Sequence, residues 1–303
     1  MKRPTLRSQL ASSAVTRQRG MAVVGALVVA SAVALFSVTV LEQQTSLAES
    51  LATDRDRRQA EWLVRGGLDW ARVVLLNDAR RSGATRAGAV WSQPVTGLPV
   101  TLPGSSRQAV FSGQITDEQG KFNLARLTTP AGTLDEAALA RLDRLLHGLG
   151  LPSASARLLA ERLRDAVAAG VVPLAVDDLL PLPGVSFHQE ELLSGHLTLL
   201  PAEAPLNINT AGAHVLAATL PGLSAAQARE IVDRRADGEA FSSVGDFIRW
   251  AGISQPGLVS RLSVDSQWFL VSGTVTLEHA GRGLKALLQR PGATLPIVRW
   301  IKD

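Results

Sequence analysis

The sequence predicts an α+β protein in which an N-terminal transmembrane helix continues into a long helix that packs on an antiparallel sheet. Three observations support this fold class. An uncharged apolar run occupies residues 21–41, β-forming residues gather at 109–124 and at 268–300, and an alanine-rich helical stretch, 125–262, separates the two β regions. A helical stretch between strands indicates an all-α domain inserted into one sheet domain, because an isolated hairpin is only marginally stable.

The apolar run begins at Met21 and reaches Leu41 without a charged residue. As a helix, these 21 residues span roughly 30 Å, the thickness of the hydrocarbon core of a bilayer. Arginines precede the run and Glu42 follows it, so the positive-inside bias places the N-terminus in the cytoplasm and everything after Leu41 outside it. A cleaved signal peptide is the less favoured alternative, because its apolar region is usually only about 7–15 residues long.

The basic excess of the chain is confined to the segment before this helix. The 303 residues carry a net charge of +4, from 31 basic and 27 acidic residues. Five basic residues and no acidic one lie in residues 1–20, which leaves 26 basic against 27 acidic residues in the remainder. The excess is therefore a topology signal rather than a surface for polyanions. The absence of cysteine excludes disulfides, thiolate metal sites and a cysteine nucleophile.

The end of the basic segment, Arg17-Gln18-Arg19-Gly20-Met21, resembles the processing site of type IV prepilins and pseudopilins. In that family, prepilin peptidase cuts after the glycine and methylates the new N-terminus. The resemblance implies that cleavage falls between Gly20 and Met21 and that Met21 becomes the N-methylated first residue. An ordinary single-span anchor remains the alternative.

The fifth position of the mature chain would then be Gly25, where most pilins have a glutamate. In that family the carboxylate offsets the N-terminal amine of a neighbouring subunit, and an unpaired charge among apolar helices is unfavourable. A subunit with no neighbour above it has no such amine to neutralise. Gly25 therefore suggests the first subunit, at the tip of a filament.

Beyond the membrane span the helix is expected to continue to about Leu76. A close approach to a sheet would explain its Gly66-Gly67 pair, because glycine is unfavourable inside a helix. Residues 82–106 read as a Gly/Pro-rich connection, and the six tryptophans are more typical of a core than of a ligand platform. The predicted apolar stripe of the helix consists of Leu47, Leu51, Leu63, Trp70 and Val74.

The β segments are predicted at 109–115, 121–124, 268–277, 284–289 and 297–300. Asp117-Glu118-Gln119-Gly120 is expected to form the turn after the first segment, and Gly281-Arg282-Gly283 the turn before 284–289. The acidic pairs Asp117-Glu118 and Asp177-Asp178 are interpreted as solvated turns or helix caps.

The helical stretch contains an internal repeat. Residues 150–157 align with 222–229, residues 176–180 with 244–248, and residues 184–186 with 252–254. Each copy reads as a helix, a glycine hairpin and a second helix. Ser224 is predicted to cap the helix from Ala225 to Arg235.

The second copy resembles the helix-hairpin-helix modules of DNA-binding proteins, in which hairpin amides contact a phosphate. Its segment from Pro201 to Leu262 carries five arginines against six acidic residues. Because affinity for nucleic acid depends largely on neutralising phosphates, this segment is a poor candidate, and nucleic acid is not an expected partner. A membrane-anchored DNA-binding protein of competence type remains the alternative function.

Signatures of catalysis are weak. The five histidines form no metal-binding array, and His188 with Glu190 and Glu191 is only a loose cluster. Neither a nucleophile elbow nor a phosphate-binding loop occurs in the sequence. The chain is therefore expected to be non-catalytic.

The prepilin junction, the motif DEQGKFNL at 117–124 and the motif NINTA at 207–211 occur together. In this combination the whole chain resembles type II secretion system protein K, the large minor pseudopilin. The resemblance implies a pilin-like α/β domain interrupted by a helical domain, and a complex with minor pseudopilins I and J at the tip of the periplasmic pseudopilus. It also suggests bound calcium, although no cofactor is required and no EF-hand-like loop identifies the ligands.

These features divide the chain into a leader peptide (1–20), a transmembrane helix (21–41), a pilin-like domain in two parts (42–124 and 263–303) and an inserted α-helical domain with two helix-hairpin-helix-like repeats (125–262). The predicted function is that of a non-catalytic tip subunit in the inner membrane. It would initiate a short pseudopilus and take part in exporting folded proteins across the outer membrane. The insertion favours a cap, because it is too bulky to repeat along a filament.

Overall fold

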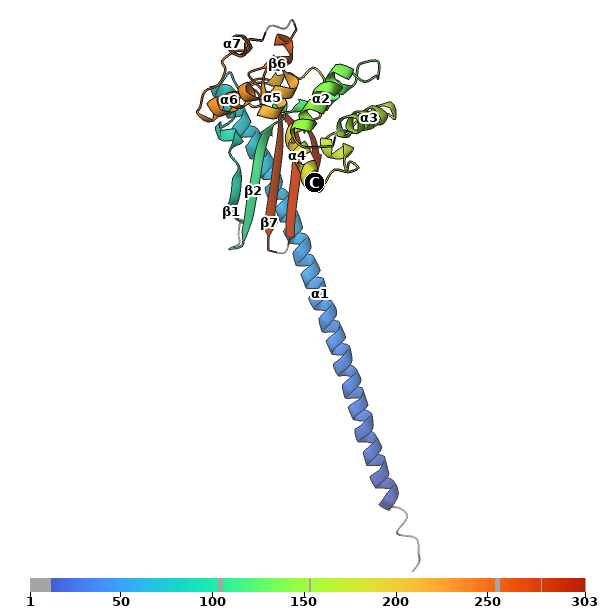
Figure 1. Ribbon diagram of the computed structural model, residues 1–303. Coiled ribbons are helices and arrows are strands. Elements are labelled where there is room, and N and C mark those ends of the chain that lie inside the picture. Colours follow the sequence, from blue (N-terminus) through green and yellow to red (C-terminus); the bar gives the residue numbers. More distant parts are fainter. Residues whose placement is uncertain (1–11, 103–105, 153, 254–256, 279, 303) are drawn as a thin grey trace, which may run out of the picture. The chain divides into compact units, whose positions relative to one another are not determined.

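The computed structural model describes residues 12–102, 106–152, 154–253, 257–278 and 280–302. The chain divides into two units, Met1–Arg58 and Gln59–Asp303. Figure 1 shows the order of the elements, of which α1 (Ser12–Arg81) is the longest helix in the described residues.

The first unit consists, in its described part, of the N-terminal portion of α1. The helix contains a window of mean hydropathy 2.5, none of it buried, and is long and apolar enough to cross a membrane. The predicted N-terminal apolar helix is thus present. The predicted end near Leu76 is wrong, because α1 continues to Arg81. Arg80 and Arg81 occupy its last turn, where the helix dipole favours positive charge.

The second unit is built on a five-stranded sheet in the order β1-β2-β7-β8-β9, in which all neighbours are antiparallel. Figure 1 shows the C-terminal part of α1 running along this sheet. A hydrophobic core that includes Leu75, Trp91 and Phe269 fills the space between them. The strands are β1 (Val95–Thr101), β2 (Gln108–Asp117), β7 (Trp268–Leu277), β8 (Ala280–Gln289) and β9 (Ile297–Lys302).

The described residues between β2 and β7 form six helices, together with short strands and 3₁₀ turns, and the helices gather at one end of the sheet in Figure 1. They have a separate hydrophobic core that includes Leu142, Leu159 and Phe247. The helices are α2 (Glu136–Gly148), α3 (Ser155–Ala168), α4 (Phe187–His196), α5 (Ala213–Thr219), α6 (Ala225–Ala236) and α7 (Val244–Ala251).

Two pairs of two-residue strands connect distant segments of this helical region by hydrogen bonds, and the strands of each pair are parallel. They are β3 (Phe122–Asn123) with β4 (Leu197–Thr198), and β5 (Leu206–Asn207) with β6 (Leu262–Ser263). The 3₁₀ turns are η1 (Val90–Ser92), η2 (Glu118–Gly120), η3 (Leu124–Leu127), η4 (Val176–Leu179) and η5 (Val259–Arg261).

The five predicted strands are present, but β1, the two-residue strands β4, β5 and β6 and the position of one turn differ from the prediction. Strand β1 falls in the predicted connection 82–106, because Gly97 and Pro99 make its sequence atypical of a strand. It is an edge strand, and edge strands tolerate both residue types. The predicted turn at Gly281-Arg282-Gly283 is wrong, because these residues lie inside β8. The chain reverses earlier, since Leu277 already pairs with Ala280.

The aligned segments of the internal repeat form similar hairpins. Helix α2 contacts α3, and α5 contacts α6. The matched Gly150 and Gly222 have φ values of 76° and 89°, which suit glycine at the start of each hairpin turn. The copies differ further on, where η4 in the first corresponds to α7 in the second. The predicted cap is confirmed, because Ser224 Oγ accepts a hydrogen bond of 3.2 Å from the Gln227 N–H.

The buried face of α1 in the second unit differs from the predicted stripe. It consists of Ala60, Val64, Leu68, Ala71 and Leu75, at helical spacing. Leu63 and Val74 pack beside this face as predicted, whereas Leu47, Leu51 and Trp70 are exposed. Apolar residues occur on more than one side of the helix, so the sequence pattern alone does not identify the packed side.

The tryptophan prediction is confirmed at four of the six positions, which lie in or pack against a hydrophobic core, and is wrong at the other two. Trp91 is buried, but Trp62 and Trp70 on α1 are 75% and 53% exposed. The other three, Trp250, Trp268 and Trp300, are half-buried.

The Gly66-Gly67 pair meets the sheet through Gly67. A Cβ placed on Gly67 would overlap the ring of Phe111 in β2, whereas nothing lies within 4 Å of a Cβ placed on Gly66. Gly113 also makes room for the ring, since its Cβ would lie 3.0 Å from Phe111 Cζ. The predicted close approach is confirmed for Gly67.

Replacing Gly67 by alanine is expected to destabilise the protein by about 1–3 kcal/mol, because the Phe111 ring must move. Gly66→Ala is the matched control and is expected to be neutral or to stabilise by up to about 1 kcal/mol, because alanine favours the helix. Denaturant unfolding of the detergent-extracted chain, followed by tryptophan fluorescence, measures both. Equal effects at the two positions would contradict this packing.

Candidate functional site

A buried polar junction lies at the seam between the helical region and the sheet. Strand β2 ends at Asp117, and the chain returns to the sheet at Trp268 in the neighbouring strand β7. The motifs DEQGKFNL and NINTA both contribute to this seam. We define the junction as Thr85, Asp117, Asn207, Thr210, Ser266 and Arg290, which are linked by hydrogen bonds between side chains and through the backbone of Thr85 and Ser266.

Asp117 is the centre of the junction and is only 6% exposed. Its Oδ2 accepts hydrogen bonds from Ser266 Oγ and Thr210 Oγ1, both at 2.6 Å, and from Asn207 Nδ2 at 3.2 Å. Its Oδ1 accepts the Gln119 N–H at 2.9 Å. Burial raises the pKa of Asp117, and these four hydrogen bonds oppose the rise only in part. Among the described residues, no cation pairs with this carboxylate.

Asn207 joins the junction to two further segments of the chain. Its Nδ2 lies 2.8 Å from Ser266 Oγ and 3.2 Å from the Thr85 carbonyl oxygen. Its Oδ1 accepts the Asn209 N–H at 2.9 Å. The side chain is fully buried, so each of its polar atoms needs these partners.

Arg290 connects the end of α1 to the residues that precede β7. Its Nη1 donates to the Leu75 carbonyl at 3.1 Å and to Asp78 Oδ2 at 2.9 Å. Its Nη2 donates to Thr85 Oγ1 at 2.8 Å and to the Ser266 carbonyl at 2.9 Å. The residue is 5% exposed, and its charge is matched by Asp78 rather than by Asp117.

The expectation that Asp117 and Glu118 are solvated is wrong. Glu118 is 5% exposed, its Oε1 lies 2.6 Å from Lys121 Nζ, and its Oε2 accepts Thr198 Oγ1 at 2.6 Å. The expectation of a cap is confirmed for Asp117, which caps η2. Local sequence could not reveal the burial, because the covering residues come from segments about 80–150 positions away.

The other polar residues of the two motifs hold nearby backbone in place. Gly120 has no room for a side chain, because its Cβ would lie 2.9 Å from Thr210 Oγ1. Side-chain amides satisfy carbonyl groups: Gln119 Nε2 donates to Pro205, Asn123 Nδ2 to Pro201 and Asn209 Nδ2 to Phe241, at 2.8, 2.9 and 3.0 Å. Both motifs are therefore structural in their contacts.

The acidic pair Asp177-Asp178 links η4 to β8 and β9, the last two strands in the order of the sheet. Asp177 pairs with Lys285 of β8 at 2.8 Å, and Asp178 pairs with Lys302 of β9 at 2.5 Å. Although partial burial raises the pKa of Asp177, its contacts with Lys285 and Ser194 outweigh this and lower the pKa. The cap expectation is confirmed for Asp178, whose Oδ2 accepts the N–H of Ala175, the N-cap residue of η4, at 3.1 Å.

The predicted processing residues belong to the first unit. Gly20 and Met21 lie in the backbone of α1, and the Met21 side chain is 77% exposed. Nothing lies within 4 Å of a Cβ placed on Gly25. Cleavage after Gly20, methylation of Met21 and the role of Gly25 stay predictions.

The described residues contain no group of three histidine, aspartate or glutamate side chains that could hold a metal ion. The side chains described therefore do not identify ligands for the calcium that the family resemblance suggests. Among the described histidines, His196 and His214 make a ring contact in which the ring centroids lie 6.0 Å apart. In the predicted His188 cluster, Glu190 accepts the Leu182 N–H at 3.0 Å, which is a structural role.

Comparisons with known proteins show similarity to type II secretion system protein K. Two family models, both described as type II secretion system protein K, match residues 120–175 and 206–272. Type II secretion system protein K of Pseudomonas aeruginosa is 29% identical over 90% of this chain and 89% of its own length. The protein of that name from Klebsiella pneumoniae is 28% identical over 95% and 99%. The resemblance to protein K is confirmed.

The solved structure of the GspK-GspI-GspJ complex from enterotoxigenic Escherichia coli contains a similar chain. The similarity has a TM-score of 0.60 at 20% identity and covers 84% of this chain and 98% of that one. At this identity it shows a shared fold. The matched protein K segments include three of the six junction residues, since Asn207, Thr210 and Ser266 lie within 206–272. The DNA-binding alternative is not supported by these relatives.

Sequence reasoning missed three members of the junction. Thr85, Ser266 and Arg290 lie outside both motifs and are isolated polar residues in the sequence. Asp117 and Asn207 were identified through the motifs, but their burial was not. Ser266 and Arg290 lie within two residues of predicted strand ends, which is a usable signal, whereas Thr85 lies in the predicted connection 82–106 and carries none.

Asp117→Asn is expected to destabilise the protein by about 1–3 kcal/mol near neutral pH. The new side-chain amide has an NH₂ group in place of one carboxylate oxygen, and this group must face a residue that donated a hydrogen bond to that oxygen. The raised pKa of Asp117 means that the folded state binds a proton more readily than the unfolded state. Proton binding by Asp117 therefore adds to the free energy of unfolding at low pH, and this added stability is lost as the pH rises through the folded pKa. The stability difference between wild type and Asp117→Asn should therefore grow as the pH falls from 7 towards 4.

Asp177→Asn is the matched control with the opposite sign. Its lowered folded pKa contributes stability above the unfolded pKa that is lost as the pH falls. The difference in free energy of unfolding between wild type and Asp177→Asn should shrink as the pH falls from 7 towards 4. Denaturant unfolding at several pH values tests both, and parallel trends for the two variants would count against the buried carboxylate.

Proposed function

We propose that the protein is a non-catalytic minor pseudopilin at the tip of the type II secretion pseudopilus. It takes part in pseudopilus initiation and in the export of folded proteins across the outer membrane. The observation that carries the proposal is the match of two protein K models in a chain whose N-terminal helix is long and apolar enough to cross a membrane.

The proposed maturation and topology follow from the N-terminus. Prepilin peptidase removes residues 1–20, Met21 is methylated, and residues 21–41 span the inner membrane with the N-terminus in the cytoplasm. The basic residues before the helix support this orientation. Gly25 leaves the helix without the carboxylate that pairs with an overlying subunit, which supports a place at the tip.

The proposed domains are a pilin-like domain, 42–124 and 263–303, and an inserted helical domain, 125–262, with two helix-hairpin-helix repeats. Support comes from the separate core of the helical region and from the adjacent strands β2 and β7 between which it lies. The similar hairpins at Gly150 and Gly222 support the repeats. The repeats act in packing, with no nucleic acid as partner.

The proposed partners are the minor pseudopilins I and J. The Escherichia coli protein of similar fold was solved in a complex with GspI and GspJ. We propose that this chain requires no cofactor for its role and that calcium, if bound, adds stability.

Maturation can be tested with Gly20→Phe. Prepilin peptidase is expected to leave this variant uncut, because a bulky side chain replaces the glycine before the cleavage site. Mass analysis of the membrane-extracted protein should give a methylated chain that begins at Met21 for the wild type and an intact leader for the variant.

Gly25→Ala is the control for that experiment, because the position is open and lies beyond the cleavage site. It should be processed like the wild type. An intact leader on the wild-type protein, in cells that contain prepilin peptidase, would remove the pseudopilin proposal.

The place at the tip predicts association with pseudopilins I and J from the same organism. Co-expression and affinity purification of the full chain should recover both partners in stoichiometric amounts. Deletion of the gene should reduce secretion, and the wild-type gene should restore it. Recovery of the major pseudopilin alone would contradict the tip position.

A further inference from the structure

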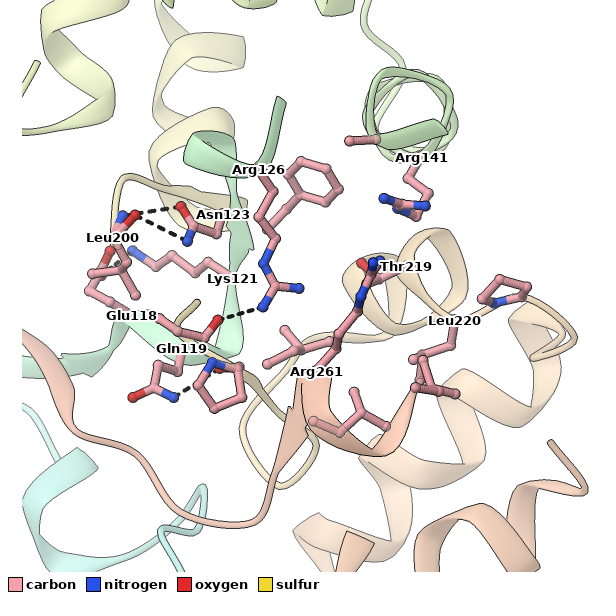
Figure 2. Close-up of a pocket in the computed structure, with 18 residues that line it drawn as sticks. Glu118, Gln119, Lys121, Asn123, Arg126, Arg141, Leu200, Thr219, Leu220 and Arg261 are labelled. Carbon is pink, nitrogen blue, oxygen red and sulfur yellow. Dashed lines mark hydrogen bonds and ion pairs between the residues drawn. The ribbon is translucent and has the colours of Figure 1, made fainter. Parts of the chain in front are cut away.

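A cavity of about 90 Å³ lies beside the junction, within the second unit. It forms where the residues after β2, helix α2 and the loop after α5 meet (Figure 2). One wall is apolar and includes Leu220, Pro221 and Leu258. The rest of the wall is polar and carries several arginines.

Three arginines from separate elements reach this cavity. Arg126 lies in η3, Arg141 in α2 and Arg261 in η5. Figure 2 shows their guanidinium groups around the space beside Thr219. Burial lowers the pKa of Arg126, and the charges of Arg261 and Arg141 lower it further. The three cations are therefore close enough to repel one another.

Little in the protein compensates these charges. Arg126 donates to the carbonyl groups of Ala202 and Ala204 at 3.0 and 2.7 Å, which orients it without neutralising it. Arg141 and Arg261 make no hydrogen bond or ion pair with any residue that the structure describes. Burial lowers the pKa of Arg141 as well, although the charge of Asp135 offsets part of this effect.

The acidic residue of the cavity wall is already engaged. Glu118 pairs with Lys121 at 2.6 Å, so the two charges cancel. The described lining residues thus leave three positive charges around one small space, and only Arg141 is offset in part, by Asp135. Mutual repulsion of this kind is unfavourable in the empty protein and is relieved when an anion binds.

A second observation points to a ligand. Thr219 Oγ1 is buried in the cavity wall and has no hydrogen-bond partner in the described part of the chain. A buried hydroxyl without a partner is unfavourable, and it can donate to an oxygen atom of a ligand. Guanidinium groups bind planar carboxylates through two parallel hydrogen bonds. The volume suits a single carboxylate group with a short apolar neighbour.

We propose that this cavity is an anion-binding site that accepts a carboxylate between Arg141, Arg261 and Thr219. The carboxylate belongs either to a free organic acid or to an acidic side chain of a polypeptide. Arg261 is exposed, which gives a ligand access from solvent. The proposal does not depend on the proposed role in secretion.

Isothermal titration of the detergent-extracted full chain with sodium succinate tests the site, with sodium chloride at equal ionic strength as the blank. Succinate should bind the wild type. Arg141→Gln and Arg261→Gln should each weaken binding about tenfold or more, because each removes a charge-assisted hydrogen-bond donor. In the absence of succinate, both variants should unfold at the same denaturant concentration as the wild type or higher, because repulsion is relieved.

Arg229→Gln is the matched control, since Arg229 is exposed in the same helical region and does not line the cavity. It should bind succinate like the wild type. A tetraglutamate peptide blocked at both ends distinguishes the sources. If the peptide competes with succinate, the bound carboxylate belongs to a polypeptide. If the peptide does not compete, the site binds a free acid.

Three results would overturn the proposal. The first is that succinate does not bind the wild type. The second is that Arg229→Gln weakens succinate binding as much as Arg141→Gln and Arg261→Gln do. The third is that inorganic phosphate binds in preference to succinate. The wild type provides a readout that needs no variant, because succinate should raise its midpoint of thermal unfolding and chloride should not.

Discussion

The structure of the second unit depends on the burial of one carboxylate. A charged group removed from water is stable only when fixed donors replace the lost hydration. Asp117 obtains these donors from Asn207, Thr210 and Ser266, none of which is near it in the sequence. The helical region and the sheet must therefore meet at one position for the carboxylate to be satisfied. Any shift would leave a buried charge without partners.

This requirement explains how the sheet tolerates a long helical excursion. The chain leaves the sheet after Asp117 and returns at Trp268, and these positions lie next to each other in neighbouring strands. The two ends of the excursion are thus close in space. Arg290 extends the same network to the end of α1, so that the long helix, the sheet and the helical region share one set of hydrogen bonds.

Local patterns predicted the elements whose cause is local. The segment 268–277, which is rich in β-forming residues, is strand β7, and Ser224 caps α6 as its position before the helix suggests. Elements set by distant contacts were not predictable in the same way. Strand β1 is hidden by Gly97 and Pro99, and the packed side of α1 is decided by the sheet it meets.

The candidate site shows the same division. The two motifs identified Asp117 and Asn207 as residues of interest, yet the residues that bury them lie elsewhere in the chain. The arginine cavity was invisible for a related reason. A charge count over Pro201 to Leu262 is close to neutral, whereas the cavity combines Arg261 with Arg126 and Arg141 from outside that segment.

Hydrogen exchange in the full-length protein tests most directly whether the buried carboxylate holds the two cores together. Exchange of backbone amides would be compared between the wild type and Asp117→Ala, in strands β2 and β7 and in helices α5 and α6. If the junction unites them, protection should fall in the strands and in the helices by the same factor. Loss of protection in the helices alone, with an unchanged sheet, would show that the two cores are independent and would contradict the role assigned to Asp117.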